Sequence, residues 1–131
     1  MDTKLTTISS IEAFFYDLLV NAGISQNVYV GDFPHNVKDS WNEAVIIDTA
    51  GYMRNLGSRC ETSVLVMLYA KPFGDGSKNV PKLDEMENKL HEAISGCAHE
   101  HYFVRMGSQY ADYDQARDLH CNIYTIELLI S

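Results

Sequence analysis

Residues 60–70 read CETSVLVMLYA, a run rich in the β-branched and aromatic side chains that favour extended strands. Because neighbouring side chains of a strand point to opposite faces of a sheet, the run divides into two sets. The set expected to face the core comprises Thr62, Val64, Val66, Leu68 and Ala70. The opposite face carries Glu61 and Ser63, but also Leu65, Met67 and Tyr69. This second face is too apolar for simple exposure to water, so we expect something to cover it as well.

Strand signals also lie on both sides of this run. The predicted strands are, in chain order, Val28–Val30, Ala44–Ala50, Cys60–Ala70, Tyr102–Tyr110 and Cys121–Ile130. The last of them places Tyr124, Ile126, Leu128 and Ile130 on one face. The stretch from His35 to Glu43 is polar around Trp41 and has no period, so it is predicted to be a loop.

Two segments have the period of an amphipathic helix. The first begins at Ser9-Ser10-Ile11-Glu12, which resembles a capping box, and Gly23 supplies its end. Its apolar stripe comprises Ile11, Phe14, Phe15, Leu18, Leu19 and Ala22. The second follows a Gly-containing turn, begins at Asn79 and Pro81, and ends at Gly96. Its stripe comprises Leu83, Met86, Leu90, Ile94 and Cys97.

The predicted order is therefore helix, three strands, helix, two strands. Consecutive strands without a helix between them indicate antiparallel hairpins, and the two helices are expected to pack on one face. The sequence thus predicts an α+β fold, with a single layer of mostly antiparallel mixed sheet. No repeat or linker divides the chain, so residues 1–131 are expected to form one domain.

The composition excludes several classes of function. A net charge of −8 argues against a protein that coats nucleic acid, although DNA passing through an acidic pore without specific binding is compatible with it. Solubility is the simpler explanation of the same charge. Three cysteines without repeated spacing indicate a reducing compartment. No run approaches the about 20 apolar residues of a membrane span, and no signal peptide is recognised, so we expect a cytoplasmic origin and no membrane partner.

Candidate chemical sites are weak. His91, Cys97, His99 and His101 form the best set of metal ligands, but a polar turn between helix and strand explains them more simply. Cys121 beside His120 suggests a nucleophile and its base, yet neighbours in a strand point to opposite faces.

Two further segments have simpler explanations. Gly74-Asp75-Gly76-Ser77-Lys78 is Gly-rich, but it lacks the spacing of a phosphate-binding loop. Asp112, Asp114 and Asp118 are interpreted as a solvated turn between the last two strands rather than a cation site. The sequence therefore predicts no catalytic residue, no cofactor, no metal and no enzyme activity.

The segment from Tyr52 to Arg59 is both apolar and basic, which is unusual at the tip of a hairpin. It contains Tyr52, Met53, Arg54, Leu56 and Arg59. Such a tip either folds back on its own domain, with arginines pairing to surplus carboxylates, or contacts another protein. We favour the contact and add the second strand face and the following turn. The predicted interface comprises Tyr52, Met53, Arg54, Leu56, Arg59, Leu65, Met67, Tyr69 and Phe73.

In layout the chain resembles the tail terminator, or tail completion, proteins of long-tailed bacteriophages, a family that includes related neck and minor tail proteins. The resemblance rests on the N-terminal helix, the strand pair with an Arg-containing tip, and Val66-Met67-Leu68-Tyr69-Ala70-Lys71 leading into a Gly-Asp-Gly turn and a helix. A Tyr-rich turn at Tyr110-Ala111-Asp112-Tyr113 and a final apolar strand complete it. It covers nearly the whole chain, but the loop around Trp41 has no assigned counterpart.

The resemblance implies a virion protein that is assembled in the cytoplasm of a bacterial host. It would form a homo-oligomeric ring, usually a hexamer, that caps the tail tube and joins it to the head connector. Its partners would be the tube protein and the connector protein, and DNA would pass through the ring. The alternative is a small bacterial α+β domain that binds a protein, a metal or another ligand and has no role in a phage.

Overall fold

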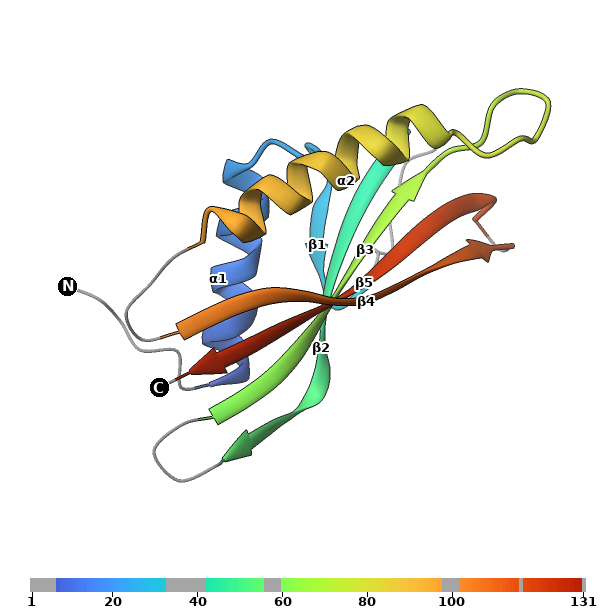
Figure 1. Cartoon of the computed structure of the whole chain (residues 1–131). Coiled ribbons are helices and arrows are strands. Elements are labelled where there is room, and N and C mark those ends of the chain that lie inside the picture. The colour runs from blue at the N-terminus through green and yellow to red at the C-terminus, as the bar shows by residue number, and fades with distance from the viewer. Residues whose placement is uncertain (1–6, 33–41, 56–59, 98–101, 116, 131) are drawn as a thin grey trace.

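A computed structural model describes residues 7–32, 42–55, 60–97, 102–115 and 117–130, with residues 50–55 described by their backbone. Two helices and five strands follow the predicted order (Figure 1). The helices are α1 (Ile8–Asn21) and α2 (Val80–Ser95). The strands are β1 (Val28–Val30), β2 (Glu43–Asn55), β3 (Cys60–Ala70), β4 (Tyr102–Asp114) and β5 (Leu119–Ile130).

The strands form one mixed sheet in the order β1-β2-β3-β5-β4, and both helices lie on the same face of it (Figure 1). β1 pairs with β2 in parallel, and all other neighbours are antiparallel. The predicted α+β fold is thereby confirmed. The last strand of the chain, β5, lies between β3 and β4. β4 is therefore at the edge of the sheet.

The main core lies between the helices and the sheet. The inward face of β3 is buried as predicted, with Val64, Val66, Leu68 and Ala70 at 0% exposure and Thr62 at 4%. α1 contributes Ile11, Phe15 and Leu19, and α2 contributes Leu83, Met86, Leu90 and Ile94. The predicted face of β5 is buried too, with Tyr124, Ile126, Leu128 and Ile130 in the same cluster.

The ends of the helices follow capping chemistry, with one correction. The N-cap of α1 is Thr7, whose hydroxyl accepts from the backbone N–H of Ser10 while the Ser10 hydroxyl accepts from that of Thr7. The predicted box of Ser9 and Glu12 therefore lies two residues too far along the chain, because either serine or threonine can supply the acceptor. Asn79 caps α2 as predicted, by accepting from the N–H of Lys82 at 3.2 Å. Neither described helix has the length and apolar character that a membrane crossing requires.

Two strands extend further than the sequence predicts. β2 continues from Glu43 to Asn55 through a register shift between Thr49 and Met53, so the predicted loop ends one residue earlier and Tyr52 to Asn55 belong to the strand. β4 continues to Asp114 through a second shift between Met106 and Gln109. A glycine lies within each shift, Gly51 in β2 and Gly107 in β4, and there the alternation of apolar and polar residues that predicts a strand is interrupted. Asp112 and Asp114 are consequently strand residues, not turn residues.

Candidate interaction surfaces

The face of the sheet opposite the helices carries a second apolar cluster. Its buried members are Ala44, Ile46, Tyr69, Leu119, Cys121 and Ile123, and Tyr29, Leu65 and Met67 pack against them partly buried. The described residues place no helix over this face. The predicted apolar character of the second face of β3 is therefore observed. Tyr69 on this face is buried, whereas Leu65 and Met67 are half-buried and have no described helix over them.

Two titratable groups of this cluster are held in their neutral forms. Burial raises the pKa of the Cys121 thiol from an ordinary value near 9.0 to about 11, and the charge of Asp112 adds to the shift. Burial also raises the pKa of Tyr69. The hydroxyl of Tyr69 donates to the sulfur of Met67 at 3.7 Å. Cys121 is 3% exposed within this apolar cluster, and a raised pKa lowers the fraction of reactive thiolate.

His120 is not placed to act as a base for Cys121. Its ring lies 4.8 Å from the ring of Tyr113, with which it is paired across β4 and β5. Cys121 lies in the cluster on the opposite face, as the alternation of strand side chains requires.

The predicted interface residues fall in separate places. Leu65, Met67 and Tyr69 share the second apolar cluster, with Tyr69 buried and the other two half-buried. Phe73 is 47% exposed in the turn after β3. Tyr52, Met53 and Arg54 lie near the opposite end of β3, since Met53 pairs with Thr62 and Arg54 with Glu61. Their side chains are outside the description, and Leu56 and Arg59 lie outside the described residues altogether.

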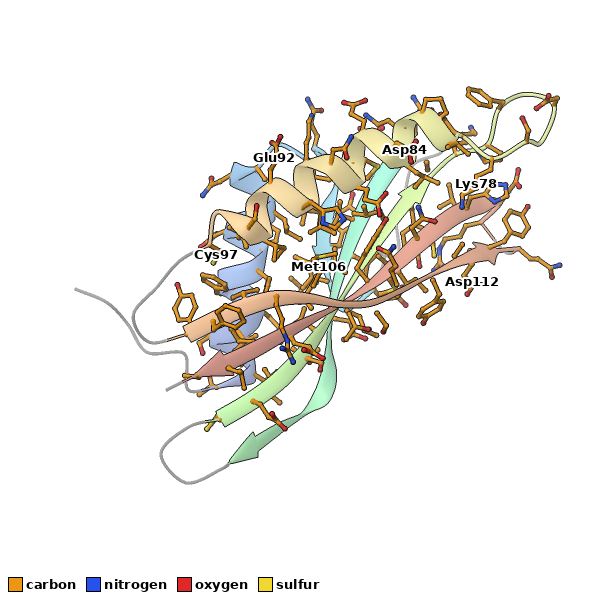
Figure 2. The ribbon with its side chains drawn as sticks, in the orientation of Figure 1. Lys78, Asp84, Glu92, Cys97, Met106 and Asp112 are labelled. Carbon is orange, nitrogen blue, oxygen red and sulfur yellow. The ribbon has the colours of Figure 1, made fainter. Side chains whose placement is uncertain are left out.

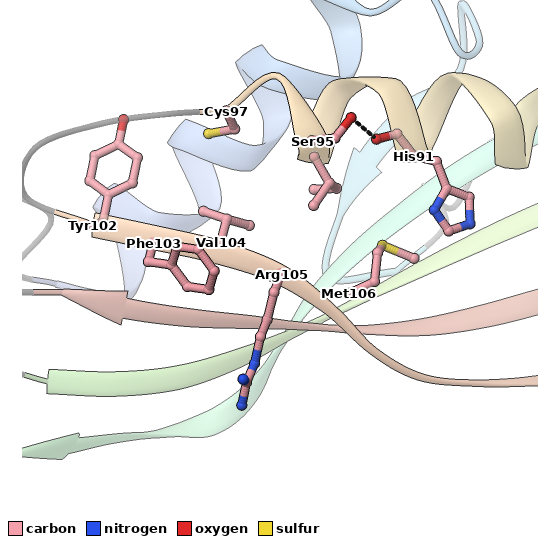
Figure 3. A pocket seen from close by; sticks show the side chains of 9 residues that line it. His91, Ser95, Cys97, Tyr102, Phe103, Val104, Arg105 and Met106 are labelled. Carbon is pink, nitrogen blue, oxygen red and sulfur yellow. Dashed lines mark hydrogen bonds between the residues drawn. The ribbon is translucent and has the colours of Figure 1, made fainter.

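The structure has a groove between α2 and β4 that the sequence does not predict. It has a volume of about 490 Å³ and is lined by His91, Ile94, Ser95, Cys97 and residues 102–106 (Figure 3). Val104 and Met106 project toward the helix, whereas Arg105 points away from it (Figure 3) and pairs with Glu127. Cys97 closes one end of the groove, beyond the last turn of α2 (Figure 2). Burial raises the pKa of the Cys97 thiol.

The predicted metal candidates are only partly brought together. His91 and Cys97 line the same groove, but His99 and His101 lie outside the described residues. Within the described ranges, no group of three or more histidine, cysteine or acidic side chains is placed to hold a metal ion. His91 instead lies 3.7 Å from the carboxylate of Glu87, one helical turn away.

The Gly-rich turn before α2 satisfies its own polar groups. The carboxylate of Asp75 accepts from the backbone N–H of Ser77 at 2.9 Å and from its hydroxyl at 2.6 Å. These two bonds lower the pKa of Asp75. The ammonium group of Lys78 donates to the side-chain oxygen of Asn122 at 3.1 Å. An internal carboxylate therefore occupies donors that a phosphate would need, which favours the interpretation as a simple turn.

The acidic residues at the end of the β4–β5 hairpin are also engaged. Asp114 accepts from the guanidinium group of Arg117 at 2.9 Å, and Asp118 accepts from the hydroxyl of Tyr113. The bond to Asp118 raises the pKa of Tyr113. These contacts fix the turn, and they leave fewer oxygens for a divalent cation.

Comparison with known proteins adds no family. No protein-family model matches the chain, and no curated protein matches it significantly. The resemblance to tail terminator proteins therefore stays a prediction from the sequence.

Proposed function

We propose that this protein is a structural assembly subunit of a long-tailed bacteriophage. It self-associates into a ring, caps the tail tube and joins it to the head connector, and it acts in the virion after assembly in the host cytoplasm. The observation that carries the proposal is the second apolar cluster, which includes the half-buried Leu65 and Met67 on a face without a described helix. Fully burying a side chain of this size contributes about 1.5–3 kcal/mol, so a partner surface gains from completing the burial.

The protonation of the buried groups agrees with a role in packing rather than in chemistry. Burial raises the pKa of the thiols of Cys97 and Cys121 and that of the Tyr124 hydroxyl. An active site typically does the opposite for its nucleophile, by lowering the pKa of that group. The proposal accordingly assigns function to surfaces and not to a reacting group.

The net charge of −8 suits a ring through which DNA passes. Phosphate groups are repelled by acidic walls, so the DNA is guided without being bound. The ring therefore needs no specific contact with nucleic acid.

The test combines the protein with the tail tube protein of the same phage genome. Polymerisation of the tube is followed by electron microscopy, with and without the purified protein, and its mass is measured by light scattering. We expect an oligomer and tubes that stop growing when it is added. A Leu65→Glu variant that retains its circular dichroism is expected to stop tubes less efficiently, and Ile8→Glu on the exposed side of α1 is the matched control. A protein that stays monomeric and leaves tube growth unchanged contradicts the proposal.

A second candidate function is a protein-binding domain without a phage role, and the groove between α2 and β4 favours it. An edge strand beside a helix can receive an extended peptide as an additional strand. Isothermal titration against extended peptides from proteins encoded nearby tests this candidate. Binding that is lost in a Val104→Lys variant, in a genomic setting without capsid or tail genes, would favour it over the assembly role.

A further inference from the structure

We propose that neighbouring copies of this chain join edge to edge. The segment Phe103–Met106 of β4 in one copy pairs in antiparallel fashion with the outer part of β2, Asp48–Asn55, in the next copy. This inference rests on the proposed self-association and names the contact that produces it.

The sheet leaves two edges available for this contact. β4 is the last strand of the sheet, and the described residues place no further strand beside it. On the other side, β1 pairs only with Val45, Ile46 and Ile47 of β2. From Asp48 onward, the described part of the chain places no strand on the outer side of β2. Among the described residues, both edges therefore present backbone donors and acceptors of the kind that pair with another strand.

The two edges lie at the same level of the sheet. One row of paired residues runs from Val104 through Leu128 and Thr62 to Met53. The adjacent row runs from Phe103 through Leu129 and Glu61 to Arg54. Figure 1 shows the same arrangement, with β4, β5, β3 and β2 side by side at the end of the sheet near the C-terminus. A neighbour can thus be added without a shift along the strands.

The strand directions are also compatible. Each step from β2 to β3, from β3 to β5 and from β5 to β4 is antiparallel, so β2 and β4 run in opposite directions. A rotation about an axis close to the strand direction keeps these directions and brings β4 of one copy beside β2 of the next. The new pair is then antiparallel, the arrangement that forms the slightly more stable ladder. A head-to-tail contact related by pure rotation closes into a ring, whereas one with a shift grows into a filament.

The first part of the β4 edge, before the register shift that follows Met106, lacks the side chains that usually protect the edges of monomeric proteins. Edge strands commonly carry lysine, proline or strong charge to prevent pairing. Phe103–Met106 contains neither lysine nor proline, and its one charge, Arg105, pairs with Glu127 of the same protomer. Phe103 is 58% exposed, the highest value among the large apolar side chains of the described residues.

The groove beside β4 gives the added strand a place for its side chains. Alternate residues of a strand that pairs with β4 point toward α2, where Ile94, Val104 and Met106 line a space of about 490 Å³. The sequence of the outer part of β2 includes the apolar neighbours Tyr52 and Met53, and strand alternation allows one of the two to point toward this groove. A second copy thus offers both the backbone edge and an apolar side chain that this groove accommodates.

The test uses Phe103→Lys, which adds a charge to the proposed contact at an exposed position that does not support the core. Val20→Lys is the matched control, because Val20 is also an exposed apolar side chain, at 42%, but lies in the last turn of α1, outside the proposed contact and the predicted interface. Light scattering gives the oligomer mass of each variant over a range of concentrations. Hydrogen exchange read by mass spectrometry compares the dilute and the associated wild-type protein. We expect Phe103→Lys to weaken association at least about tenfold and Val20→Lys to leave it unchanged. The amides of Phe103–Met106 and of Asp48–Asn55 should gain protection together.

The outcomes separate this inference from the proposed function. A stable oligomer that Phe103→Lys leaves intact, or in which protection appears on other surfaces, overturns the edge contact and leaves the assembly role standing. Open filaments in place of closed particles overturn the pure rotation. A wild-type protein that remains monomeric alone and with tube protein overturns both proposals. Binding of a peptide of another protein at β4, without self-association, overturns the inference in favour of the peptide-binding domain.

Discussion

Replacing Gly107 by alanine should destabilise the protein, because backbone atoms close the space at this position. Gly107 lies at the register shift of β4, and a methyl group there would lie 2.9 Å from the carbonyl oxygen of Thr125 on β5. An ordinary contact begins at 3.4 Å, so β4 and β5 must separate locally by about 0.5 Å. A backbone oxygen within a strand ladder cannot rotate away as the end of a flexible side chain can. The substitution therefore disturbs the pairing of the two strands.

Two effects of opposite sign set the magnitude. Forcing extra volume into a closed site typically costs about 1–3 kcal/mol. Restricting the unfolded chain by replacing glycine with alanine stabilises by about 0.4–1 kcal/mol. The overpacking term is the larger, and we expect the free energy of unfolding to fall by about 1 kcal/mol. In a domain of this size that corresponds to a decrease of roughly 3–5 °C in Tm.

Urea unfolding followed by far-ultraviolet circular dichroism measures this difference. Gly74→Ala is the matched control, because a methyl group there would contact no atom within 4 Å and the residue does not adopt a positive φ. We expect the control to be as stable as the wild type or more stable by about 0.4–1 kcal/mol. If Gly107→Ala gains stability as the control does, the strands separate freely at the register shift, and the fixed contact inferred from the 2.9 Å distance is refuted.

Three further changes have defined outcomes. Asn79→Ala removes the N-cap of α2 and should lower the free energy of unfolding by about 1 kcal/mol, as measured in urea. The control Asn88→Ala, on the exposed side of the same helix, should change it by roughly a few tenths of a kcal/mol. Met86→Ala, at 0% exposure in the main core, should cost about 2–5 kcal/mol by calorimetry or urea unfolding, and a smaller loss would mean that the core collapses around the cavity. Folding raises the pKa of the Cys121 thiol from about 9.0 in the unfolded chain to about 11. The neutral thiol therefore contributes its full stabilisation below pH 9.0, and this contribution is lost as the pH rises to about 11. The difference in stability between wild type and Cys121→Ser should therefore change across this alkaline range, and an unchanged difference would show that the thiol is not shielded from water.

The sequence predicts the fold wherever burial imposes a regular period. The alternation of β3 between Thr62 and Ala70 is clear because helices cover one of its faces and apolar neighbours surround the other. The ends of β2 and β4 are not predictable in this way. At Gly51 and at Gly107 the alternation stops, and beyond Met106 the strand is largely exposed, so its residues carry no apolar pattern to recognise.

The candidate surfaces are predictable only where they lie within one strand. Leu65, Met67 and Tyr69 are neighbours along one face of β3, and alternation alone places them together. The groove lies between α2 and β4, which follow one another in the chain, but no local signal in the sequence predicts a space between them. β4 is an edge strand because β5 pairs with β3 and thus lies between β3 and β4. This pairing is a long-range contact, and no single residue or local pattern in the sequence predicts it.

That insertion has a consequence for assembly. Between the outer part of β2 and the first part of β4, the sheet consists of four strands, β2, β3, β5 and β4, and every neighbouring pair is antiparallel. An even number of such strands makes the two outer edges run in opposite directions, so copies added head to tail meet as antiparallel strands. With an odd number, the same addition would bring parallel edges together, which form a less stable ladder. The short β1 preserves this property, because it covers β2 only at Val45 to Ile47 and leaves the antiparallel edge beyond it available for the next copy.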